Sequence, residues 1–68
     1  MEELIDKLVK ISINGELPIM VRLIKIEQYG YIFQNIEFEG TKVGYVDKKK
    51  FFVSHSTPLL IIFDEELN

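Results

Sequence analysis

The sequence contains no cysteine and a single histidine, His55. Disulfide bonds, thiolate metal sites and histidine-rich metal cages are therefore excluded. No apolar run approaches the roughly 18 residues of a membrane-spanning helix, and no signal-peptide pattern opens the chain. The four glycines form no phosphate-binding loop. From these absences we expect a cytoplasmic protein with no membrane partner and no cofactor.

The residues that are present suffice for one small folded domain over 1–68. The 68 residues are 47% hydrophobic, 12% aromatic and 28% charged, which is too apolar for a disordered chain. The formal net charge of −3 provides no overall positive field that would attract nucleic acid. Ten isoleucines and seven lysines accompany one arginine and no alanine. This codon-linked bias indicates an AT-rich genome, such as that of a low-GC microbe or a phage.

The first nine residues have the spacing of a short helix. Apolar residues at positions 4, 5, 8 and 9 would line one face of that helix. Acidic side chains in its first turns would offset the helix dipole. The pattern predicts a helix over Met1–Val9, and the alternative is a frayed N-terminus.

The rest of the chain has the patterns of β-structure. Asn14-Gly15 is a strong hairpin-turn signal, and the change of side-chain parity at Leu23-Ile24 predicts a β-bulge or sharp bend. The predicted strands are Lys10–Asn14, Ile19–Ile26, Tyr29–Glu39, one starting at Val43, Phe51–Val53 and Leu59–Phe63. The expected fold is mainly β: a short N-terminal helix followed by a five-stranded, strongly bent antiparallel small barrel.

The last predicted strand is apolar at every position: Leu59, Leu60, Ile61, Ile62 and Phe63. Such a strand favours burial on both faces, although only one face of a barrel strand meets the core. An exposed and uncharged edge strand would also be an aggregation site. We therefore expect these five residues to form a subunit interface in a homo-oligomer. The alternative is that the N-terminal helix covers the outer face.

Catalytic chemistry finds little support in the sequence. Ser54, His55 and Ser56 are adjacent, but strand alternation would place both serines opposite the imidazole. Carboxylates are paired at Glu37/Glu39 and again in 64–66, where solvated charge is the simpler explanation and no calcium-loop spacing occurs. We expect no catalytic residue, no metal site and no enzyme activity.

Recognition chemistry is better supported. Aromatic rings stack on unpaired bases, lysines neutralise phosphates, and glutamine side chains read base edges. The residues with this chemistry are Arg22, Lys25, Gln28, Tyr29, Tyr31, Phe33, Gln34 and Asn35 around Gly30, and then Lys48, Lys49, Lys50, Phe51 and Phe52. A structural explanation stays open beside it, because aromatic residues at strand spacing usually belong to a core and a triple lysine usually belongs to a solvated turn.

The order of these elements resembles the Sm-like (LSm) family, and in particular its Hfq-type branch. The similarity is carried by the Asn14-Gly15 turn and by Val21–Asn35, in which Ile26-Glu27-Gln28-Tyr29 stands where Hfq typically has Phe-Asp-Gln-Phe. Val21 occupies a position that is usually glycine, and the Tyr-Lys-His signature is not found in order. Diverged Sm-like proteins also occur in phages.

The resemblance implies a homo-oligomeric ring of roughly five to seven subunits, in which the fourth strand of one barrel pairs with the fifth strand of the next. It also implies single-stranded, U-rich RNA as a ligand. Tyr29 would stack on a base, Gln28 would contact the base edge, and one of Lys48, Lys49 and Lys50 would hold a phosphate. The rival hypothesis is an SH3-like protein-interaction module, or a phage-encoded inhibitor of a host protein, with no nucleic-acid role. The net charge of −3 favours this rival.

Overall fold

The computed structural model describes residues 1–39, 42–44 and 49–68. For 37–39 and 42–44 it describes the backbone alone. Most of these residues belong to β-strands. In chain order the elements are a 3-10 turn η1 (Glu2–Leu4), β1 (Leu8–Ile13), β2 (Ile19–Ile26), β3 (Gly30–Asn35), β4 (Glu37–Glu39), β5 (Lys42–Gly44), β6 (Lys50–Ser54), β7 (Leu59–Phe63) and a second 3-10 turn η2 (Glu65–Leu67). No helix of the described ranges is long and apolar enough to cross a membrane.

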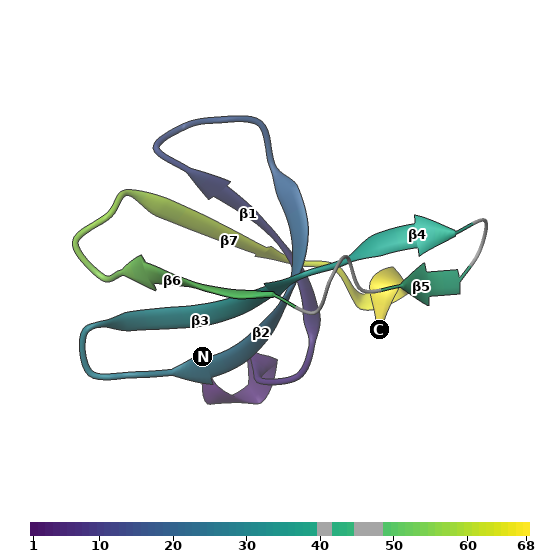
Figure 1. The fold of residues 1–68 in the computed structure, drawn as a ribbon, viewed down its shortest axis with the longest axis horizontal. Coiled ribbons are helices and arrows are strands. Elements are labelled where there is room, and N and C mark those ends of the chain that lie inside the picture. The colour runs from purple at the N-terminus through teal and green to yellow at the C-terminus, as the bar shows by residue number, and fades with distance from the viewer. Residues whose placement is uncertain (40–41, 45–48) are drawn as a thin grey trace.

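Five of the strands form one antiparallel sheet in the order β6-β3-β2-β1-β7, and β4 pairs with β5 in a separate hairpin. The hairpin projects away from the main sheet (Figure 1). The predicted five-stranded antiparallel arrangement is thus confirmed, but the main sheet is not closed, because β6 and β7 are its two edges. The single strand predicted over Tyr29–Glu39 is wrong: β3 ends at Asn35 in the main sheet, and β4 belongs to the separate hairpin. Only residues 55–58 connect these edges. Since such a connector spans at most roughly 18 Å, the sheet must curl strongly to bring its edges together at that end.

The predicted N-terminal helix over Met1–Val9 is wrong. A 3-10 turn spans Glu2–Leu4, the chain reverses at Asp6 with a φ of 66°, and β1 already begins at Leu8. A helix of about two turns is marginal by itself, whereas a strand here gains a hydrogen-bonded ladder with β2. Val9 pairs with Val21 and is completely buried in the sheet. Tertiary burial therefore overrides the helical spacing.

Two local predictions about the strands are confirmed. Asn14 and Gly15 have φ values of 53° and 75°, and the amide of Glu16 donates to the carbonyl oxygen of Ile13 over 3.0 Å. These values are typical of the type I′ turn that Asn-Gly favours. In β2 the pairing register shifts between Leu23 and Lys25, so that Ile24 is the extra residue of a β-bulge.

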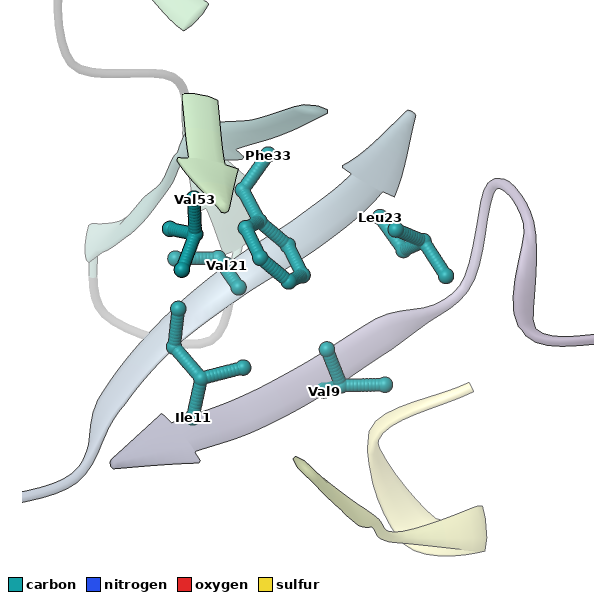
Figure 2. Close-up of a cluster of buried hydrophobic side chains, with 6 residues drawn as sticks. All are labelled: Val9, Ile11, Val21, Leu23, Phe33 and Val53. Atoms are coloured by element: carbon teal, nitrogen blue, oxygen red, sulfur yellow. The ribbon is translucent and has the colours of Figure 1, made fainter. Parts of the chain in front are cut away.

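The core lies inside the curl of the sheet and is entirely apolar. Side chains from β1, β2, β3 and β6 point toward one another there (Figure 2): Val9, Ile11, Val21, Leu23, Phe33 and Val53. Phe33 is the largest fully buried residue, and its ring lies 5.7 Å from that of Phe51 and 5.8 Å from that of Tyr31, measured between ring centroids. Leu4 and Ile5 of the N-terminal segment pack against this cluster.

The side chain of Asn68 hydrogen-bonds to the first residue of β1. β7 ends at Phe63, which pairs with Val9, so the backbone of Leu8 has no strand partner on that side. The side chain of Asn68 takes this place. The amide of Leu8 donates to Asn68 Oδ1 over 2.7 Å, and Asn68 Nδ2 donates to the carbonyl oxygen of Leu8 over 2.9 Å. One side-chain amide therefore continues the ladder for one more residue.

Candidate recognition loop and sheet edges

The loop between β2 and β3, residues 27–29 and here called the recognition loop, presents Gln28 and Tyr29 at one end of the sheet. The amide of Glu27 donates to the carbonyl oxygen of Gly30 over 2.8 Å, which closes a tight loop around these two residues. Both side chains are exposed, and Tyr29 keeps 72% of its surface accessible. A ring with this exposure is available to stack on a ligand.

Close packing requires glycine at the base of this loop. A Cβ atom on Gly30 would lie 2.3 Å from the carbonyl oxygen of Val53 and 2.5 Å from the ring of Phe52. Gly30 pairs with Ser54, so β3 and β6 begin their ladder at the same end as the loop. The absence of a side chain lets the Phe52 ring lie over the β3 backbone.

The connector between β6 and β7 folds against the recognition loop through His55. Its amide donates to the carbonyl oxygen of Tyr29 over 2.9 Å, and its ring Nε2 lies 2.9 Å from the carbonyl oxygen of Glu27. Because a carbonyl oxygen only accepts, this second contact requires a proton on Nε2. The imidazole also meets the Tyr31 ring edge to face, with 4.7 Å between centroids. Through these two hydrogen bonds, His55 anchors the recognition loop to the β6–β7 connector, a role that sequence spacing did not reveal.

Two of the predicted lysines, Lys49 and Lys50, lie away from this loop. Lys50 pairs with Gln34, four residues along the β3–β6 ladder from the Gly30–Ser54 pair. At about 3.3 Å per residue, this places Lys50 roughly 13 Å from the loop end of the ladder. Lys49 precedes it and is exposed, and Lys48 lies outside the described residues. Lys25 lies beside the loop, with its Nζ 3.5 Å from Glu27 Oε1.

The aromatic residues around Gly30 divide between exposed and core positions. Phe33 is fully buried, and Tyr31 is half-buried against Phe33 and His55. For Phe33 the structural explanation of the aromatic spacing is therefore right. Tyr29 is the member of this group that stays largely exposed.

The apolar edge strand β7 alternates between two environments over its first four residues, and its last residue, Phe63, is 41% exposed although it has the parity of Leu59 and Ile61. Leu59 and Ile61 pack against the core cluster, whereas Leu60 and Ile62 are 58% and 40% exposed. The N-terminal segment does not cover this outer face, since its apolar residues pack on the core instead. On the opposite edge, Phe52 of β6 is 53% exposed. The outer faces of both edges therefore carry uncovered apolar side chains.

The residues considered for catalysis are bonded to other groups. Ser54 Oγ and Ser56 Oγ lie 2.8 Å apart, while the ring nitrogen Nε2 of His55 meets the backbone of Glu27. In the acidic tail, Asp64 Oδ1 caps η2 by accepting from the amide of Glu66 over 2.9 Å. The described part of the chain contains no metal-binding group of histidine, cysteine and acidic residues and no pocket.

No protein-family model matches the chain, and neither the curated proteins nor the solved structures yield a match. The resemblance to Sm-like proteins therefore rests on the residues quoted above and on the order of the strands.

Proposed function

We propose that this chain is an Sm-like subunit that assembles into a homo-oligomeric ring and binds single-stranded RNA. The strand order supports the assembly. Its two edges, β6 and β7, are different strands with different sequences. Pairing β6 of one copy with β7 of the next is a head-to-tail contact, and such a contact produces a closed ring when its rotation closes.

The observation that carries this proposal is the apolar surface on the outer face of both edges. Of the described side chains, eight large apolar residues are exposed, and three of them, Phe52, Leu60 and Ile62, lie on the outer face of β6 or β7. Edge pairing would extend one sheet into the next and bring Phe52 of one copy beside Leu60 and Ile62 of its neighbour. The same pairing would satisfy the open backbone groups of both edges, which otherwise favour uncontrolled association.

The recognition loop supplies the proposed RNA contacts. Tyr29 would stack on a base and Gln28 would bond to its edge, as in other proteins that bind unpaired U-rich strands. In a ring, every copy would present the same exposed ring at the same end of its sheet. Repeated weak contacts along one strand then add up through their high effective concentration.

The exposed β7 edge also favours a second candidate, an SH3-like interaction module or an inhibitor of a host protein. An extended segment of another protein could add to this edge as an extra strand, with Leu60 and Ile62 providing apolar contacts. This hypothesis requires no RNA and agrees with the net charge of −3.

The native mass in solution distinguishes the two candidates. We expect light scattering after size exclusion to give roughly five to seven times the chain mass of 8.0 kDa. The Ile62→Lys variant should run as a folded monomer, because a charge on the outer face of β7 would be buried in the ring. Leu17→Lys is the matched control, since Leu17 is 89% exposed in the β1–β2 loop and should leave the mass unchanged. A wild-type monomer would contradict the ring.

RNA binding is tested at Tyr29. We expect Tyr29→Ala to weaken binding to an oligouridylate by about 1–3 kcal/mol, the usual contribution of one stacked base. Tyr29→Phe keeps the ring and should retain the affinity. Circular dichroism should show the wild-type fold in both variants because the side chain is exposed. Equal affinities of wild type and Tyr29→Ala would remove Tyr29 from the site.

A further inference from the structure

Charged residues are distributed very unevenly between the five-stranded sheet and the rest of the chain. The five strands, which the structure describes in full, contain none of the eleven acidic residues. They contain four of the eight basic residues: Lys10, Arg22, Lys25 and Lys50. The net charge of −3 therefore hides a sheet that is purely cationic.

All four cations lie on the outer face of the sheet. Lys10 stands between the buried Val9 and Ile11, and Arg22 stands between the buried Val21 and Leu23, so both point away from the core. Beyond the bulge, Lys25 pairs with Ile32, which alternates with the core residue Phe33. Lys50 pairs with Gln34, the residue after Phe33. The inner face has no charge at all among these strands.

The pairing register brings these groups close together. Lys50, Gln34 and Arg22 are successive partners across β6, β3 and β2, so the row spans about 10 Å. Lys10 belongs to the next row and pairs with Met20, two residues from Arg22 in β2. Lys25 continues the face toward the recognition loop. Lys25 Nζ lies 3.5 Å from Glu27 Oε1, but this ion pair is exposed to solvent. The attraction in such a surface pair is weak.

In the sequence, all eleven acidic residues fall between or beyond the five strands. Those whose side chains the structure describes belong to the N-terminal turn and Asp6, the β1–β2 and β2–β3 loops and the C-terminal tail. The hairpin extends away from the main sheet in Figure 1. On the outer face of the five strands, a polyanion therefore meets only cationic and neutral side chains of the strands themselves, and the described acidic group beside them is Glu27, which pairs with Lys25. A cationic surface of this kind attracts a phosphate backbone.

We infer that the outer face of β1, β2, β3 and β6 is a second nucleic-acid site, which binds the phosphates of a single strand leaving the recognition loop. Lys25 adjoins the loop, and Lys50 and Lys10 continue the path across the sheet. Arg22 lies between them, where its Nη1 donates to the backbone carbonyl oxygen of Asp6. The inference rests on the proposed function for the identity of the polyanion, and it assigns to the sheet face a role that the loop does not fill.

The salt dependence of binding tests this face separately from the loop. The probe is a fluorescein-labelled oligouridylate, followed by anisotropy while KCl is raised from about 50 to 200 mM. We expect Lys10→Gln and Lys50→Gln each to reduce the slope of log affinity against log salt by about 0.7, the value for one phosphate contact with a single strand. The double variant should lose about twice as much. Lys7→Gln, at an exposed position before β1, is the charge-matched control and should keep the full slope.

Each outcome decides between the loop and the face. If Tyr29→Ala lowers affinity while Lys10→Gln and Lys50→Gln keep the wild-type slope, the loop site stands and the face site is overturned. If wild type fails to bind the oligouridylate at the lowest salt, both sites are overturned. Binding to vesicles that contain phosphatidylserine, without binding to the oligouridylate, would overturn the nucleic-acid assignment and identify the face as a membrane-binding surface.

Discussion

Alternate residues of the same five strands build two very different surfaces. The inner face carries the apolar side chains of the core, such as Ile11 and Phe33, which are completely buried. The outer face combines cations with exposed apolar residues at both edges, such as Phe52 and Leu60. Because strand alternation separates the two sets of positions, the inner set can specify the fold while the outer set remains available for binding. Substitutions on the two faces should therefore have different consequences.

The largest difference is expected between Phe33→Ala and Phe52→Ala. Loss of the fully buried Phe33 ring should lower the free energy of unfolding by about 3–5 kcal/mol, which a domain of this size can hardly sustain. Phe52→Ala on the outer face should cost less than about 1 kcal/mol. Urea denaturation in the Ile62→Lys background measures both, so that subunit contacts do not contribute. Equal losses would show that the outer face also stabilises the single chain.

Substitution of Gly30 tests whether every position on the outer face tolerates a different side chain. Gly30→Ala should cost about 1–3 kcal/mol, because its methyl group would overlap the Val53 carbonyl oxygen and the Phe52 ring. Adding Phe52→Ala should recover only the part due to the ring. Gly15→Ala is the control: no atom lies within 4 Å of its added Cβ, and the expected loss of about 1 kcal/mol comes from its φ of 75° alone. Wild-type stability of Gly30→Ala would contradict the close contact.

A smaller effect is expected at the end of the sheet, where a side chain replaces a strand. Asn68→Ala should lower stability by about 1 kcal/mol, since the Leu8 amide and carbonyl lose their partners. Hydrogen exchange at the Leu8 amide should become faster. Asn68→Asp keeps the acceptor for this amide and should give an intermediate protection. Unchanged exchange in Asn68→Ala would show that the contact does not hold the end of β1.

Local patterns in the sequence predicted much of the sheet. Asn14-Gly15 adopts the expected turn, the parity change at Leu23-Ile24 marks a bulge, and β7 has one face on the core and one exposed. These features depend on neighbouring residues, whose backbone preferences and side-chain alternation are readable in the chain itself. One failed prediction, the helix over Met1–Val9, concerns a segment whose helical spacing competed with a strand partner distant in sequence.

The candidate site was only half predictable for the same reason. Gln28 and Tyr29 are adjacent in sequence, and their exposure follows from the loop that carries them. Sequence proximity gave no indication that His55 would hold that loop from another connector. It also suggested a lysine contact that the ladder register separates from the loop, since Lys50 stands at the far end of β3 and β6.

The sequence by itself determined the turn at Asn14-Gly15, the bulge in β2 and the alternation that places Ile11 and Ile13 on one face of β1. The tertiary structure decided that Leu8 and Val9 join the sheet, that β6 and β7 remain separate edges and that all the strand cations share one face. The physical reason is the range of the interactions. Backbone preferences and alternation act over a few residues, whereas pairing register and burial depend on partners brought together only by folding.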